Sequence, residues 1–172
     1  EVPQNFVELD RTLFYDENFE YEIPEIIQFE LVNVLLTNKT VSQHIRPSYR
    51  FTHHKKPSFL NVFKDVVRSK ILDKKKIDYG ILGVQDWSNN YFHWMTEVLP
   101  HIVVMHQANP TIPLLIPSNY LQYSFIHQSL ERLQIAIKTF DVKSALQVKN
   151  LFAIPVPHVG RFNEGLLHSF RD

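Results

Sequence analysis

The residues best suited to acid–base chemistry are an imidazole and a carboxylate four positions apart, His93 and Glu97. On a helix, side chains separated by four residues lie on the same face and can touch. Histidine is the side chain that most often moves a proton in catalysis, and a neighbouring carboxylate favours its charged form. The spacing fits a proton-transfer pair, but it is also the spacing of ordinary surface His–Glu pairs on helices, so the residues alone leave both interpretations open.

The polar residues that precede this pair, Ser88, Asn89 and Asn90, suit the start of a helix. The first N–H groups of a helix lack partners within it and favour anionic or hydroxyl-rich ligands. A metal site is not indicated, because no third ligand accompanies the pair and no His-Glu-x-x-His motif is present. The chain also lacks a glycine-rich phosphate loop, and its Gly80 and Gly83 suit close packing inside a strand.

The composition excludes several classes of protein. Among 172 residues, 18 Lys plus Arg balance 18 Asp plus Glu, so there is no net field to attract nucleic acid or an anionic membrane. Cysteine is absent, which rules out disulfides and thiol chemistry and favours a cytoplasmic location. No apolar run reaches the roughly 18 residues of a membrane-spanning helix. The start, Glu1-Val2-Pro3-Gln4, is neither Met-initiated nor signal-like, so we expect a piece of a longer protein.

Alternating strands and helices must position these residues. Short apolar runs predict strands at residues 31–36, 41–45, 79–84, 112–116, 135–140 and 148–154. Apolar residues three and four apart predict helices over about 57–74, 90–107 and 119–133. Residues 1–30 are acidic and aromatic, and we expect an irregular arm there. The alternation after residue 79 predicts an α/β fold with a mostly parallel sheet, preceded by a β-rich segment.

The chemistry-bearing segment directly follows the predicted strand 79–84, where open α/β sheets bind ligands. In its helix, one apolar stripe is expected to face the core: Tyr91, Trp94, Met95, Val98, Ile102 and Met105. His93 and Glu97 lie on nearly the opposite side, so replacing either is expected to leave the melting temperature almost unchanged. Pro100 cannot donate a hydrogen bond to the carbonyl of Thr96 and is expected to kink the helix.

The string from Asn90 to Pro100, N-Y-F-H-W-M-T-E-V-L-P, resembles the hallmark of glycosyltransferase family 61. Residues 113–117 resemble a P-L-L-V-P strand of that family, and residues 130–135 resemble its L-x-x-L-G-I stretch, with Gln134 where the family has glycine. Residues 151–155 resemble the strand before the family's interdomain linker. The similarity covers roughly residues 31–172.

The resemblance implies that residues 31–172 form a Rossmann-like, GT-B-type N-terminal domain that binds the acceptor. A second domain, which would bind the nucleotide sugar, is expected outside this chain, so the chain alone is expected to be inactive. Family members transfer a sugar with inversion to a glycan or protein hydroxyl, without a metal or another cofactor. The bacterial members take part in the biosynthesis of capsular polysaccharide.

The resemblance also implies roles for single residues. His93 or Glu97 would take the proton of the acceptor hydroxyl. Trp87 either stacks on a sugar ring or belongs to the core, and His158 lies in a loop that would face the second domain. The residues expected to bind substrate are therefore Asn89, Asn90, Trp87 and His158.

Other functions stay open on the residues alone. A non-catalytic α/β scaffold or interaction module would keep the fold without the chemistry. A hydrolase that uses His93 and Glu97 would need a second carboxylate or a metal ligand nearby. The expected location is the cytoplasm for a bacterial protein, with the lumen of the secretory pathway as the alternative. The donor sugar, the acceptor and the oligomeric state are left undefined.

Overall fold

The computed structural model describes residues 26–43, 46–53 and 73–156, together with positions 58, 60, 64 and 67. Its strands are β1 (Phe29–Leu36), β2 (Val41–Gln43), β3 (Arg46–Pro47), β4 (Asp73–Leu82), β5 (Leu114–Pro117), β6 (Ile137–Phe140) and β7 (Ser144–Ala153). Its helical elements are η3 (Tyr49–Phe51), α2 (Tyr91–His93), η4 (Trp94–Val98), α3 (Leu99–Ala108), η5 (Ser118–Gln122) and α4 (Ser124–Arg132). The α/β class predicted from the sequence is thus confirmed.

The strands form one open sheet of seven strands in the order β3-β2-β1-β7-β4-β5-β6. β4 pairs in parallel with both β5 and β7, and β5 pairs in parallel with β6. β1 joins the sheet antiparallel to β7, and β2 and β3 extend it with further antiparallel pairs. The sheet is therefore mixed and only partly parallel, because the early β-rich segment belongs to the same sheet instead of preceding it as a separate unit.

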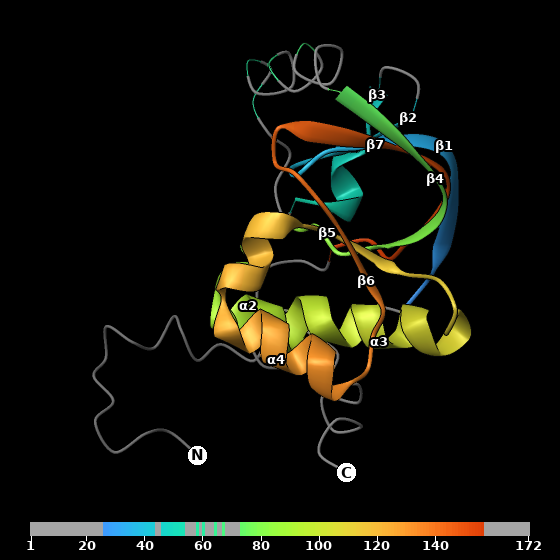
Figure 1. The fold of residues 1–172 in the computed structure, drawn as a ribbon. Coiled ribbons are helices and arrows are strands. Elements are labelled where there is room, and N and C mark those ends of the chain that lie inside the picture. Colours follow the sequence, from blue (N-terminus) through green and yellow to red (C-terminus); the bar gives the residue numbers. More distant parts are fainter. Residues whose placement is uncertain are drawn as a thin grey trace, which may run out of the picture.

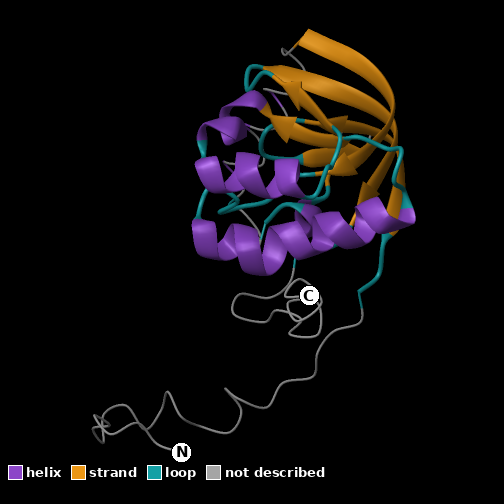
Figure 2. Cartoon of the chain, turned by 60° about the horizontal axis from the view of Figure 1, so that its bottom comes forward, coloured by secondary structure: helices purple, strands orange, loops and turns teal. Residues whose placement is uncertain are grey.

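The helices α2, α3 and α4 gather on one side of the sheet, as Figures 1 and 2 show from two directions. β4 and β7 curve together along their length (Figure 1). β5 is buried on both faces, with Leu114 and Ile116 in the cluster beneath the helices and Leu115 in the cluster on the other face. Strands covered on both faces are typical of parallel sheets.

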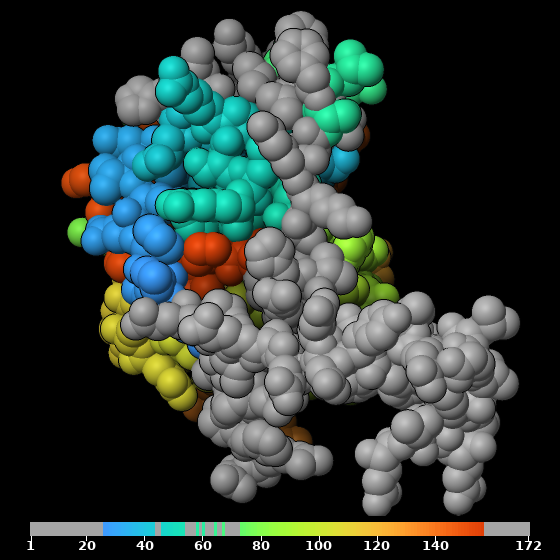
Figure 3. Space-filling model, turned by 180° about the vertical axis from the view of Figure 1, so that it is seen from behind, coloured from blue at the N-terminus to red at the C-terminus, as the bar shows by residue number. Residues whose placement is uncertain are grey.

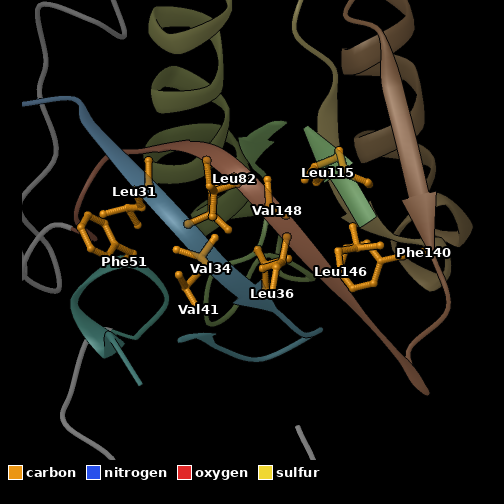
Figure 4. Packing of buried hydrophobic residues seen from close by; sticks show 14 residues of the cluster. Leu31, Val34, Leu36, Val41, Phe51, Leu82, Leu115, Phe140, Leu146 and Val148 are labelled. Carbon is orange, nitrogen blue, oxygen red and sulfur yellow. The ribbon is translucent and has the colours of Figure 1, made fainter. Parts of the chain in front are cut away.

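The opposite face of the sheet is covered by the curving sheet itself and by η3. Within the described residues, no second set of helices covers this face. Figure 4 shows the side chains of this cluster turned toward one another. The labelled members are Leu31, Val34, Leu36, Val41, Phe51, Leu82, Leu115, Phe140, Leu146 and Val148.

The segment that carries η3 is fixed against the end of β7. Phe51 is buried, and the guanidinium of Arg50 lies 4.5 Å from the ring centroids of both Phe29 and Phe51. The N–H of Val156 donates to the carbonyl of Arg50 over 2.8 Å. Figure 3 accordingly shows residues 46–53 (cyan) beside the end of β7 (orange-red) on the back of the molecule. This anchoring matters because His53 follows η3 directly.

The helix side of the sheet is anchored by Trp94, which is completely buried and whose indole N–H donates to the Ser129 hydroxyl over 3.0 Å. Val98, Ile102 and Met105 are buried with it, as the apolar stripe predicted. Tyr91 is an exception, because it is 61% exposed and its ring meets Phe125 edge-on at 5.5 Å. It lies in the first helical turn, and the ring contact described for it is with Phe125 of α4 rather than with a strand.

Some expectations concern segments that lie partly or wholly outside the described residues. Most of the arm expected at 1–30, most of the helix expected at 57–74, and His158 lie outside them; positions 60, 64 and 67 are helical and exposed. β4 begins at Asp73, six residues before the predicted strand, because its backbone pairs with β7 while the side chains of Lys74 to Lys76 stay exposed. Among the described residues, no helix combines the length and the apolarity needed to cross a bilayer.

Candidate functional site

The chemistry-bearing segment leaves the carboxyl end of β4. From there the chain passes through α2 and α3 to β5 on one side of β4, whereas β7, reached later, lies on the other side. The strand order therefore reverses at β4, and open α/β sheets bind ligands at such reversal points, beyond the carboxyl ends of the strands. The topology puts residues 85–93 at this position.

Glycines allow β5 to approach β4 closely here. A Cβ atom on Gly80 would overlap the side chain of Leu115, and one on Gly83 would overlap that of Ile116. The N–H of Gly83 donates to the carbonyl of Leu115 over 3.1 Å. The packing role predicted for both glycines is confirmed, and it brings the ends of the two strands together under the site.

The turn after β4 is fixed by Ser88, which is buried. Its hydroxyl donates to the Gln85 carbonyl over 2.7 Å and accepts from the Gln85 N–H over 3.2 Å. The N–H of Asp86 donates to the carbonyl of Thr52 over 2.6 Å, so the turn is also tied to the segment after η3. Trp87 adopts a left-handed φ of 62° in this turn, and its side chain is exposed. A backbone strained in this way is held by its surroundings, and such residues cluster at functional sites.

Asn90 caps the helix. Its Oδ1 accepts from the N–H of Phe92 over 2.9 Å and from that of His93 over 3.4 Å. These bonds satisfy two of the first-turn N–H groups that the sequence suggested for a ligand, so fewer donors remain for an anion. The side-chain amide nitrogen of Asn90 is the part left to meet a ligand.

The side chains of His93 and Glu97 meet, as their spacing predicted. His93 Nδ1 lies 3.1 Å from Glu97 Oε1, and the two side chains differ in burial: 19% of the imidazole is exposed but only 1% of the carboxylate side chain. The expectation that Glu97 lies on an exposed face is wrong, because residues 97–102 are buried without interruption and the middle of this helix is covered all round. Glu97 can therefore orient the imidazole but cannot itself reach a ligand.

A wide helical turn joins the two members of the pair. Residues Trp94–Val98 form a π turn, in which the N–H of Leu99 donates to the carbonyl of Trp94, five residues earlier. Pro100 then lies in the first turn of α3, where a missing N–H is tolerated. The irregularity expected around Pro100 is thus present as a π turn before it. Such turns occur frequently at functional sites.

His93 lines an open concavity of about 400 Å³ together with Trp87, Asn89 and Asn90. The Trp87 ring lies 4.8 Å from the imidazole centroid, and the ring of Phe92 lies 5.6 Å from it. Four of the six predicted site residues are thus brought together in one hollow, with Glu97 behind His93. Trp87 lies outside the core, since 44% of it is exposed, and it lines the concavity.

Two further groups at the site were missed by the sequence analysis. Tyr120 follows the carboxyl end of β5 and hydrogen-bonds Ser88; burial raises its pKa to about 12, so its hydroxyl keeps its proton. His53 follows η3, and its Nε2 lies 3.7 Å from Asp86 Oδ1. The position of Tyr120 after the next parallel strand was a usable signal, whereas nothing in the sequence brings His53 to Asp86.

The charge around the concavity is not suited to phosphate. None of the described residues that line it is a lysine or an arginine, and the carboxylates of Asp86 and Glu97 belong to residues next to these or in contact with them. Within the described part of the chain, no group of three or more His, Cys, Asp or Glu side chains could hold a metal ion. An imidazole backed by a carboxylate, beside an indole and two amides, can accept a proton from a bound hydroxyl group.

Comparisons of the chain with protein-family models, with curated proteins and with solved structures returned no match.

Proposed function

We propose that this chain is the acceptor-binding half of an inverting glycosyltransferase of the type that its Asn90–Pro100 motif resembles. The observation that carries the proposal is the position of His93, with one imidazole nitrogen against a buried carboxylate and its ring on the wall of a concavity. A Rossmann-like domain of GT-B type is supported by the parallel strand order β6-β5-β4-β7 and by the location of the concavity at its reversal point.

In this proposal His93 is the base. Its Nδ1 lies 3.1 Å from Glu97 Oε1, which leaves Nε2 to take the proton of an acceptor hydroxyl as the oxygen attacks the anomeric carbon of the donor. The carboxylate fixes the tautomer and stabilises the imidazolium that forms, as a buried acid does beside a catalytic histidine. The departing nucleotide leaves with the donor's bonding electrons, and no metal or other cofactor takes part.

The lining of the concavity supports a sugar as the ligand. The indole of Trp87 offers an exposed apolar face, and the side-chain amides of Asn89 and Asn90 offer hydrogen bonds at its edge. Ligand sites commonly combine aromatic surface with a few placed polar groups in this way. The nucleotide sugar would be bound by a second domain, because the described residues that line this concavity include no lysine or arginine for its phosphates.

The test is sugar transfer by the full-length protein, measured with a panel of nucleotide sugars and glycan acceptors. His93→Ala should lower the rate by about a hundredfold or more, the usual contribution of a general base. The matched control is His127→Ala, since His127 also faces a glutamate four residues later but lies exposed on α4, and this variant should leave the rate unchanged. Full activity of His93→Ala would contradict the assignment, and absence of transfer with every donor would favour the non-catalytic module.

A further inference from the structure

A second imidazole–carboxylate pair lies at the same end of β4, one residue before Trp87. The side chain of Asp86 is 40% exposed, and that of His53 is 14% exposed. Asp86 is held through its backbone, because its N–H donates to the carbonyl of Thr52 over 2.6 Å. The proposed transfer reaction makes no use of this pair.

The ring of His53 is fixed from three directions. Its Nδ1 lies 2.8 Å from the Thr52 hydroxyl, its Nε2 faces Asp86 Oδ1, and the Tyr49 ring meets it edge-on at a centroid distance of 5.0 Å. Both ring nitrogens thus face polar groups of neighbouring residues, the Thr52 hydroxyl and the Asp86 carboxylate. The imidazole therefore holds the Asp86 side chain in place without removing it from solvent.

The consequence is a partly exposed carboxylate directly before Trp87, which lines the hollow. The adjoining lining residue is Trp87, and the Asn90 cap already uses two first-turn N–H groups of the helix. The same carboxylate lies close enough to influence Tyr120, which hydrogen-bonds the turn at Ser88. An acidic group on a ligand that contacts Trp87 would lie near the Asp86 carboxylate, and none of the described lining residues would offset this with a lysine or arginine.

We propose that Asp86, held by His53, makes this site select glycans whose sugars are neutral or carry an amino group, and reject those that carry a carboxylate or a sulfate. This inference rests on the proposed function, because it names the class of acceptor. A unit charge several ångströms away, near a protein surface, corresponds to about a threefold to tenfold difference in affinity. Asp86 is in this view a specificity-determining residue, and it takes no part in proton transfer.

The experiment measures binding of the full-length protein to matched pairs of glycans, one neutral and one with a single sugar oxidised to the uronic acid. Tryptophan fluorescence reports binding at Trp87, since Trp94, the second of two tryptophans, is completely buried. The wild-type protein should bind the neutral member at least about threefold more tightly, and this preference should shrink as salt screens the charge. Asp86→Asn should bind both members alike.

The control is Asp78→Asn, an exposed carboxylate on the body of β4, which should keep the wild-type preference. Equal binding of both members by the wild-type protein, or an unchanged preference in Asp86→Asn, would overturn the inference and leave the proposed function intact. Binding of neither member by the wild-type protein would count against the proposed function, and the inference would fall with it.

Discussion

The chain contains two His–Glu pairs of identical spacing in different environments, and their coupling energies should differ. His93 and Glu97 are 3.1 Å apart with the carboxylate side chain 1% exposed, whereas His127 and Glu131 are 3.9 Å apart with side chains 54% and 74% exposed. Exposed pairs of this kind contribute about 0.3–0.5 kcal/mol. Removing one partner of a buried pair costs about 3–5 kcal/mol, because the remaining charge stays buried without compensation.

His93→Ala should therefore lower the free energy of unfolding by about 3 kcal/mol, since it leaves the Glu97 carboxylate buried without its imidazole. Glu97→Ala should also destabilise the fold, contrary to the expectation from the sequence, because it removes a buried side chain. The double variant should be more stable than the sum of both losses indicates, with a coupling of about 2 kcal/mol. The cycle on His127 and Glu131 should show a coupling below about 0.5 kcal/mol.

Urea denaturation at neutral pH measures all seven proteins of the two cycles, which share the wild type, with the fluorescence of buried Trp94 as the probe of unfolding. Glu97→Gln, which keeps the volume of the side chain, separates the loss of charge from the loss of packing. If the effects of His93→Ala and Glu97→Ala simply add, the two side chains are not coupled. The argument that Glu97 orients the base would then fail, whatever the activity of the variants.

Two more substitutions test the interior and the backbone of the helical layer. Burial lowers the pKa of His101 from 6.5 to about 4, so between these pH values the unfolded chain binds a proton that the folded chain does not bind. The resulting contribution to the free energy of unfolding is about 3 kcal/mol. It is fully present above pH 6.5 and is lost as the pH falls toward 4. Urea titrations of His101→Leu should show a flatter decline with acid, and a decline parallel to the wild type would contradict this. Gln134 has a left-handed φ of 54°, so Gln134→Gly should raise the free energy of unfolding by about 0.5–1 kcal/mol, and lower stability in thermal melts would refute the reasoning.

The elements were predictable where a local pattern determines them. The helix expected at 119–133 and the strand expected at 31–36 follow from spacing alone, and both are present as η5 with α4 and as β1. The sheet order was not predictable, because β1 pairs with β7 through contacts such as Phe29 with Ala153, far apart in the chain. No local pattern encodes such a pairing, and the antiparallel half of the sheet was therefore not expected to join the parallel half.

The part of the site that lies in one continuous segment of the chain was predictable. Trp87, Asn89, Asn90 and His93 come together because they occupy one turn and the helix that follows it. The burial of Glu97 was not predictable from helical spacing, because it depends on what covers the helix and not on the helix itself. The partners supplied by other segments, such as the tyrosine after β5 and the histidine after η3, require the tertiary structure.

Some residues of the motif from Asn90 to Pro100 build the helix. One of them, His93, presents a titratable side chain to the concavity. Asn90 caps the first turn, Trp94 anchors the helix to Ser129, and Pro100 lies where α3 can accept it. The π turn between them keeps a carboxylate buried one turn below an imidazole that remains partly exposed. The same short sequence thus supplies both the support of the helix and a partly exposed titratable side chain, which explains why a spacing pattern alone could point to this candidate site.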